Sequence, residues 1–138
     1  MVTFTISTKG LVPDQLHGFF EGWPNPPSPE AHLRILRHSH QVVLAQDEAS
    51  GDVVGFITAI SDGSWAAYIP LLEVKPAWRG QGIGSELVRR MLAHLSDHYM
   101  VDVLCNPEVQ GFYQRQGMLP ATGACVRRYA YQAALLVK

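Results

Sequence analysis

Apolar and polar residues alternate along the first positions of the chain, and this two-residue period is typical of a half-buried strand that ends at Gly10. Two helices are predicted next, over residues 13–20 and about 29–37, because a proline stands near the start of each and Ser28 can cap the second. Residues 21–27 hold three prolines, which lack a backbone donor and push their predecessors out of helical conformations. We therefore expect a rigid loop there.

Beyond residue 41 the pattern becomes strand-like. Short apolar runs over residues 42–45 and 53–60 flank a polar turn, which predicts a β-hairpin. A second turn leads into another predicted strand over residues 65–74. Pro70 stands within that strand, and a sheet tolerates proline only at an edge, an unpaired position or a bulge. We therefore predict a bulge at Pro70.

The last third of the chain contains both helix-like and strand-like patterns of apolar residues. Residues 83–95 place apolar side chains at helical spacing, which predicts an amphipathic helix packed on the sheet. Residues 100–105 are apolar enough to predict a central strand, and a short helix follows, capped by Asn106 and stopped at Gly117. Residues 126–137 have the pattern of a final β segment, interrupted or continuous. This order of elements predicts a mixed α/β fold without internal repeats.

Composition narrows the class of protein. With 138 residues, of which 47% are apolar, the chain is expected to form one domain over residues 1–138. Its formal net charge of −1 and the absence of a basic run argue against binding to nucleic acid. The sequence shows neither a secretory leader nor an apolar run long enough to span a membrane. Cys105 and Cys125 are too few for a disulfide framework and are expected to pack as small hydrophobes, so the expected location is the reducing cytoplasm.

A glycine-rich loop between a predicted strand and a predicted helix carries the most specific chemistry. Residues 79–84 read Arg-Gly-Gln-Gly-Ile-Gly, and the three glycines let successive N–H groups converge where the helix N-terminus is partially positive. Arg79 adds a full positive charge. The loop is therefore predicted to hold phosphate. It lacks the lysine of the ATP-binding P-loop, and Ser85 stands where the dinucleotide fingerprint needs its third glycine.

Two motifs point to one family. Residues 72–84 read Leu-x-Val-x-Pro followed by the glycine-rich loop, and they resemble the acyl-CoA motif of the GNAT family of N-acetyltransferases. Residues 106–118, in which Asn-Pro precedes Phe-Tyr and then Gly-Met, resemble the second hallmark of that family. The motifs stand in the family's order and together cover about residues 68–118. The N-terminal third matches by order of elements only.

The resemblance implies a fold and a cofactor. The implied fold is α/β, a single mixed and mostly antiparallel sheet with helices on both faces. Its fourth and fifth strands splay apart and open a slot for the acyl-pantetheine arm of acetyl-CoA. The backbone of Leu72 and Val74 would pair with the pantetheine amides, and the loop would hold the pyrophosphate. The implied cofactor-binding residues are Leu72, Val74, Arg79, Gly80, Gln81, Gly82, Ile83, Gly84, Ser85, Asn106 and Phe112.

The resemblance also implies direct attack of an amine on the thioester in a ternary complex, without a metal. Tyr113 would sit beside the sulfur and protonate the departing thiolate, with a packing role in the core as the alternative. None of the strand positions where family members often carry a carboxylate is acidic here. Glu73 is the nearest substitute for a general base, or else a solvated carboxylate, and Glu21 on the proline-rich loop is a second candidate.

Aromatic residues are candidates for an acceptor pocket. Trp23, Tyr68 and Trp65 would line it if the proline-rich loop folds over the splayed strands, and core packing or a dimer contact is the alternative. His94 and His98 have the i, i+4 spacing of metal ligands. Because no matching ligands accompany them, we expect both to lie on a wet helix face and predict no metal site.

The sequence therefore predicts an acetyl-CoA-dependent N-acetyltransferase that acts on a small amine or a protein amino group. A homodimer is a further option, and neither nucleic acid nor a membrane is an expected partner. Arg127 and Arg128 are expected at the surface, with contact to an anionic acceptor or to the 3′-phosphate of the cofactor as the alternative. A non-catalytic acyl-CoA-binding sensor or interaction module is the competing function, because the usual strand carboxylate is missing. A nucleotide binder is disfavoured by the missing P-loop lysine.

Overall fold

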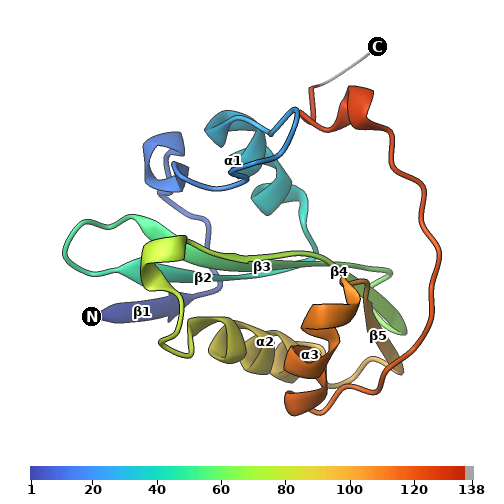
Figure 1. Ribbon diagram of the computed structural model, residues 1–138. Helices are drawn as coiled ribbons and strands as arrows, with labels where there is room; N and C mark the ends of the chain where they lie inside the picture. The colour runs from blue at the N-terminus through green and yellow to red at the C-terminus, as the bar shows by residue number, and fades with distance from the viewer. Residues whose placement is uncertain (136–138) are drawn as a thin grey trace.

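The computed structural model describes residues 1–135 and contains a five-stranded mixed sheet (Figure 1). The strands lie in sequence order, and neighbours are antiparallel except for the last two, which are parallel. The strands are β1 (Val2–Thr5), β2 (Gln41–Asp47), β3 (Val53–Ser61), β4 (Ala66–Val74) and β5 (Met100–Val103). The α-helices are α1 (Pro29–His38), α2 (Ile83–His94) and α3 (Gln110–Arg115). No helix in the described part of the chain is long and apolar enough to cross a membrane.

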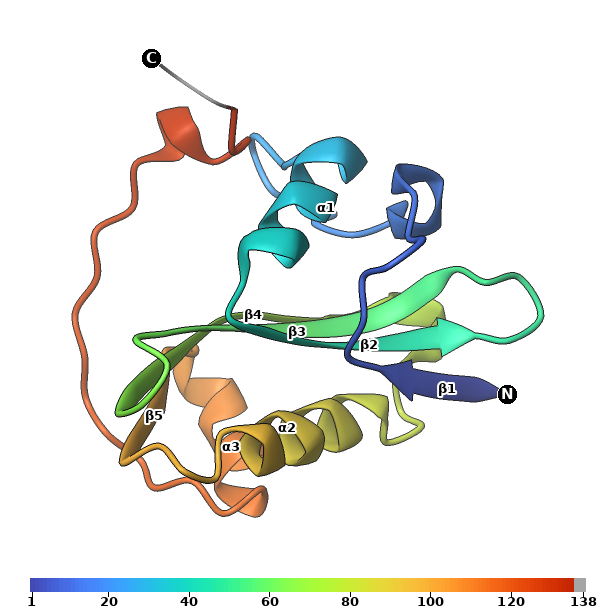
Figure 2. The same cartoon turned by 180° about the vertical axis from the view of Figure 1, so that it is seen from behind.

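Helices cover both faces of the sheet, with α1 on one side and α2 and α3 on the other (Figures 1 and 2). The Ser28 hydroxyl caps α1 by accepting a hydrogen bond from the Ala31 N–H at 3.1 Å. One hydrophobic core joins α1 to the sheet, and a second lies under α2. On the second side, α2 contributes the buried residues Ile83, Leu87, Val88 and Met91. This arrangement confirms the predicted fold class.

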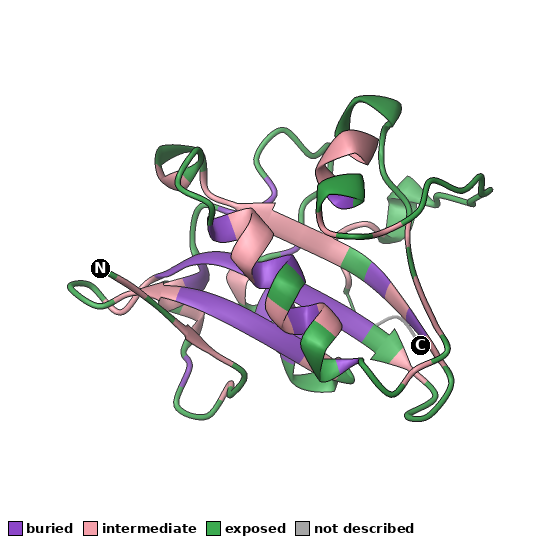
Figure 3. Ribbon diagram, turned by 90° about the horizontal axis from the view of Figure 1, so that it is seen from below, coloured by how far each residue is buried: buried purple, intermediate pink, exposed green. Residues whose placement is uncertain are grey.

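The fourth strand bulges where the sequence predicts it. Thr58 of β3 pairs with Leu71 and Ile60 pairs with Tyr68, so that two residues of β4, Ile69 and Pro70, stand opposite a single residue of β3. β5 pairs only with the first half of β4, from Ala66 to Ile69. The two strands therefore part at the bulge. Burial is greatest in β2 and β3, whereas the second half of β4 is only partly buried (Figure 3).

The helix predicted over residues 13–20 is wrong in length. Only a 3-10 turn forms, Pro13–Leu16, because Gly18 and Phe20 take left-handed backbone conformations with φ of 85° and 63°. A left-handed residue ends a right-handed helix and turns the chain aside. The segment instead turns over the sheet face that α1 covers.

Both ends of the chain also differ from the prediction. β1 stops at Thr5 because the Thr5 hydroxyl accepts a hydrogen bond from the Ser7 N–H, a local turn that replaces the strand ladder. The predicted β segment over residues 126–137 is not formed in its described part, which contains only the 3-10 turn Tyr129–Tyr131. Residues 136 and 137 lie outside the described residues. Residues 126–135 pair with no strand of the described chain.

The fifth strand is an edge strand and not a central one. β5 has four residues and ends before Cys105, because it pairs only with the first half of β4 and no later described strand joins it. Cys105 and Cys125 are both exposed, contrary to the prediction, because both lie on segments outside the strands and helices.

Candidate active site

The glycine-rich loop between β4 and α2 takes the conformation that its sequence predicts. Gly80 and Gly82 have φ of 79° and 82°, and Gly82 is the N-cap of α2. A Cβ at either position would meet no atom within 4 Å, so backbone conformation and not space requires glycine there. No side chain caps α2 in this structure, and the first N–H groups of the helix are therefore available to an anion.

A groove of about 640 Å³ extends from this loop along β4 to α3. It is lined by nine of the predicted cofactor residues, namely Leu72, Val74, Arg79, Gly80, Gly82, Ile83, Gly84, Ser85 and Phe112. Trp78 and Val109 also line the groove, although no motif marked them in the sequence. Gln81 borders a neighbouring hollow beside β1, and Asn106 is exposed with no side-chain capping bond. The structure therefore does not bring these two side chains into the groove.

The free edge of β4 forms one wall of the groove. The Lys75 N–H donates to the Val54 carbonyl of β3 at 2.9 Å, so strand alternation directs the N–H groups of Val74 and Leu72 to the opposite edge. Beyond the bulge, β5 no longer pairs with that edge. Arg79 Nε donates to the Val74 carbonyl at 2.8 Å, which holds the guanidinium close to this edge. An extended ligand that carries amides can pair with these backbone groups.

Tyr113 of α3 lines both the groove and a separate hollow beside β5. Its side chain packs against Phe112 in an edge-to-face contact and is 8% exposed. Burial raises the pKa of Tyr113 to about 12, with smaller contributions from Cys105 and Tyr68. The phenol therefore keeps its proton throughout the physiological range and can act as a donor.

Glu73 of β4 faces the side of the sheet that carries α1. It pairs across the ladder with Phe56, and its carboxylate oxygens accept hydrogen bonds from the Phe20 N–H at 3.1 and 3.2 Å. Burial raises the pKa of Glu73, outweighing the opposing effects of the Phe20 hydrogen bond and the Arg79 charge, and nearby Glu21 raises it further. A carboxylate with a raised pKa is a better proton acceptor than an ordinary exposed one. The left-handed Phe20, which the sequence did not single out, positions it.

A second pocket of about 540 Å³ adjoins the groove, and Leu72 and Glu73 line both. Of the three aromatic residues that the sequence nominates for an acceptor pocket, Trp23 and Tyr68 line this pocket. Trp65 does not line it, because its exposed ring stacks on Tyr99. The C-terminal segment supplies Arg127, Arg128, Tyr129, Tyr131 and Gln132. For Arg127 and Arg128 the sequence offered contact with an anionic ligand only as the alternative to a surface role, and it did not single out Tyr129, Tyr131 or Gln132. Glu21 does not line the pocket and is exposed.

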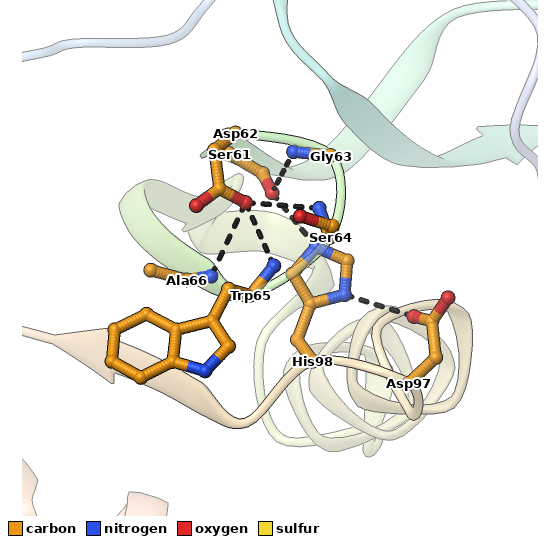
Figure 4. A network of polar contacts seen from close by, with 8 residues as sticks. All are labelled: Ser61, Asp62, Gly63, Ser64, Trp65, Ala66, Asp97 and His98. Atoms are coloured by element: carbon orange, nitrogen blue, oxygen red, sulfur yellow. Dashed lines mark hydrogen bonds and ion pairs between the residues drawn. The ribbon is translucent and has the colours of Figure 1, made fainter.

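A compact polar network lies away from these pockets, at the turn between β3 and β4 (Figure 4). His98 bonds through Nε2 to the Ser61 hydroxyl at 2.7 Å and through Nδ1 to Asp97 at 2.9 Å. Asp62 accepts backbone hydrogen bonds within the same turn, and bonds from Trp65 and Ser64 lower its pKa. The His98 side chain is 3% exposed, so the predicted wet surface is wrong for it, while His94 is exposed.

No group of three or more potential metal ligands occurs within residues 1–135. The bond between His98 and Ser61 joins the segment that follows α2 to the turn between β3 and β4.

A buried histidine supports the wall behind Glu73. The imidazole of His32 packs against Phe19, Phe20 and Phe56 with ring centroids 4.4 to 5.4 Å apart. Neither of its ring nitrogens has a hydrogen-bond partner among the described residues. Burial lowers the pKa of His32 to about 4, so the ring is neutral. A lone histidine on a helix carries no sequence signal for this role.

Comparison with known proteins agrees with this geometry. The model of the Acetyltransferase (GNAT) family matches residues 9–118. Glucosamine 6-phosphate N-acetyltransferase 1 of rice is 28% identical over 111 residues, which cover 70% of this chain and 67% of that protein. Serotonin N-acetyltransferase 2, chloroplastic, also of rice, is 30% identical over 116 residues, which cover 80% of this chain and 58% of that protein. The chain thus spans about three fifths to two thirds of the length of these curated relatives.

Solved structures give a fuller match. A crystal structure from Deinococcus radiodurans R1, assigned as an acetyltransferase, is 49% identical and has a TM-score of 0.94, covering 99% of this chain and 94% of that chain. A GNAT family acetyltransferase from Streptococcus pneumoniae TIGR4 is 29% identical with a TM-score of 0.74, covering 93% of this chain and 98% of that chain.

Proposed function

Because the chain belongs to the GNAT acetyltransferase family, we propose that it moves an acetyl group from acetyl-CoA to an amine by direct attack in a ternary complex. Family membership also confirms the enzyme class that the sequence predicts. The observation that carries the proposal is the meeting of the groove and the second pocket at Leu72 and Glu73. A thioester bound in one cavity and an amine bound in the other would come together there.

The groove supplies groups that suit the cofactor. The uncapped start of α2 and the guanidinium of Arg79 would hold the pyrophosphate. The free N–H groups of Leu72 and Val74 would pair with the amides of the pantetheine arm. When bound, acetyl-CoA supplies the activated thioester. These residues would thus fix the acyl carbon beside the second pocket.

Two ionisable groups on opposite sides of β4 divide the proton transfers. Glu73, whose pKa is raised, would accept a proton from the incoming amine, directly or through water. Tyr113, whose pKa is about 12, would donate its proton to the departing thiolate. A carboxyl and a phenol differ in their ordinary pKa values, and because burial raises both values here, Glu73 becomes a better proton acceptor while Tyr113 keeps its proton at neutral pH.

The second pocket favours an amine that also carries an anionic group. Glu73 would attract the amino group, and Arg127 and Arg128, which line the same pocket, would pair with a phosphate or carboxylate. The aromatic side chains of Trp23 and Tyr129 would cover the body of the acceptor. The relative that acts on glucosamine 6-phosphate is consistent with an acceptor of this chemistry.

The test is a thiol-release assay with acetyl-CoA and pairs of amines that differ only in an anionic group, such as an amino sugar and its phosphate ester. We expect turnover with both members and a lower KM for the anionic one. Equal KM values would refute the role of the two arginines. Binding of acetyl-CoA without thiol release from any amine or amine-bearing peptide would instead identify a non-catalytic acyl-CoA-binding module.

A further inference from the structure

The hollow beside β5 shares a wall residue with each of the other two cavities. It has a volume of about 410 Å³ and is lined by residues of β5 and α3, which lie side by side in both views (Figures 1 and 2). Tyr113 lines both the hollow and the groove, and Tyr68 lines both the hollow and the second pocket. The hollow therefore reaches the place where β4 and β5 part.

The hydroxyl of Tyr113 lies on the side of the hollow. The residue is 8% exposed, and its hydroxyl has no hydrogen-bond partner among residues 1–135. Besides burial, which is the larger cause, the charges of Cys105 and Tyr68 raise the pKa of Tyr113, and both of these residues line the hollow. A hydroxyl in such a place is satisfied by a bound group or by water. The arrangement therefore suits a polar ligand beside Tyr113.

Of the two cysteines in the chain, only Cys105 lines the hollow. It follows β5 by two residues and is exposed. Cys125 is exposed as well, but it lines neither the hollow, the groove nor the second pocket. An exposed thiol is open to oxidation. Both thiols are therefore accessible to an oxidant, and only Cys105 lies beside a ligand that reaches Tyr113.

We propose that Cys105 forms a mixed disulfide with the thiol of coenzyme A held in the groove when a peroxide is present. The proposal rests on the proposed function, which assigns the groove to the cofactor and places its sulfur beside Tyr113. Acetyl transfer converts the thioester to a free thiol, so each turnover leaves a thiol at that position. The disulfide would hold the product in the groove and exclude acetyl-CoA.

The disulfide forms in two balanced steps. The Cys105 thiolate attacks hydrogen peroxide, the O–O bond breaks, and hydroxide leaves; the cysteine sulfur is oxidised to sulfenic acid and the peroxide is reduced. The thiolate of coenzyme A then attacks the sulfenic sulfur, an S–S bond forms, the S–O bond breaks and a second hydroxide leaves.

Proximity would select Cys105 for the second step. Asp102 lines the same hollow, and a negative neighbour does not favour a thiolate, so an activated cysteine is not the cause. A cofactor held in the groove acts instead as a tether, which presents its thiol at a local concentration on the order of 1 mM. Cys125 would meet only the thiol that is free in solution.

The selectivity between the two cysteines tests the proposal. The full chain is treated with hydrogen peroxide and coenzyme A, and peptide mass spectrometry measures the adduct at each cysteine. With about 0.1 mM coenzyme A we expect about ten times more adduct at Cys105 than at Cys125, because the tethered thiol is about tenfold more concentrated. An excess of acetyl-CoA, which has no thiol, should protect Cys105 alone.

Glutathione, a thiol without a pyrophosphate, is the matched control and should show no such preference. Equal coenzyme A adducts at the two cysteines, or no adduct at Cys105, would overturn the proposal. The same preference with glutathione would also overturn it, because the selectivity would then belong to the cysteine and not to the bound cofactor.

Activity gives a second readout. After treatment with peroxide and coenzyme A, the wild type should lose thiol-release activity and regain it once dithiothreitol has been added and removed, whereas Cys105→Ser should keep its activity. Cys125→Ser is the matched control and should behave as the wild type does. Equal inactivation of Cys105→Ser would overturn the proposal. Calorimetry with coenzyme A separates the two hypotheses: no binding would refute the proposed function as well, and binding with equal adducts would refute the disulfide alone.

Discussion

Replacing Tyr113 with phenylalanine removes the hydroxyl and keeps the ring that packs against Phe112. The hydroxyl makes no hydrogen bond to another described residue, so the free energy of unfolding is expected to change by less than about 1 kcal/mol. A general acid typically contributes ~10²–10⁴-fold to the rate. We expect kcat to fall by about 10²-fold, which corresponds to about 2.7 kcal/mol of lost transition-state stabilisation. The KM for acetyl-CoA should stay nearly constant, because the lost interaction forms mainly in the transition state.

The assay is thiol release at saturating amine, with Tyr99→Phe as the matched control, since Tyr99 is exposed and stacks on Trp65 far from the groove. The pH dependence adds a second readout. The active form of Tyr113 carries its proton, which is present below its pKa of about 12 and is lost only as pH rises through that value. Wild-type activity should therefore show no Tyr113 limb below about pH 11. Wild-type kcat in Tyr113→Phe would refute the role of Tyr113 as the acid.

Three further substitutions test other parts of the site. Gly82→Glu should abolish acetyl-CoA binding measured by calorimetry, and retained affinity in a folded variant would contradict the cofactor assignment. The control Gly82→Ala adds only a Cβ in open space, so it should show the backbone strain alone, about 1–2 kcal/mol in urea unfolding. Glu73→Gln should lower kcat and remove the acidic limb of the pH–rate profile, because the proposed base must be ionised and becomes protonated as pH falls through its raised pKa. An unchanged acidic limb would assign that limb to another group. The wild type should lose about 3 kcal/mol of unfolding free energy as pH falls from about 6.5 to 4, because the unfolded chain takes up a proton there that the folded His32 does not. His32→Leu should remove this loss in urea unfolding. Equal pH dependence of the two proteins would contradict the buried neutral imidazole.

Local patterns in the sequence predict those parts of the fold whose causes are local. The bulge follows from Pro70 alone, because proline lacks a backbone N–H and a strand accepts it only at an edge, a strand start or a bulge. The loop before α2 follows from its glycines, whose left-handed conformations few other residues adopt. The 13–20 helix fails because two residues that turn left-handed, Gly18 and Phe20, stand in an apolar stretch that looks helical.

Other parts depend on contacts between distant residues, which no short pattern records. Whether a segment such as residues 126–137 forms a strand depends on a neighbouring edge, and within the described part of the chain residues 126–135 pair with none. The position of Glu73 depends on the N–H of Phe20, 53 residues away in the sequence. The alternation in β4 predicts only that Glu73 faces away from Leu72 and Val74, and the fold decides that this side borders the second pocket.

The unpaired half of β4 also makes cofactor binding observable without any chemistry. The amides of Leu72 and Val74 point to the free edge, so they should exchange with deuterated solvent readily in the free protein. The amides of Leu71 and Glu73 point to β3 and lie in the same short peptide, so they serve as an internal reference. An acyl arm bound along the edge would slow exchange at alternate residues only. Because β4 borders both cavities, slowed exchange at Leu72 and Val74 alone would distinguish a ligand in the groove from one in the second pocket.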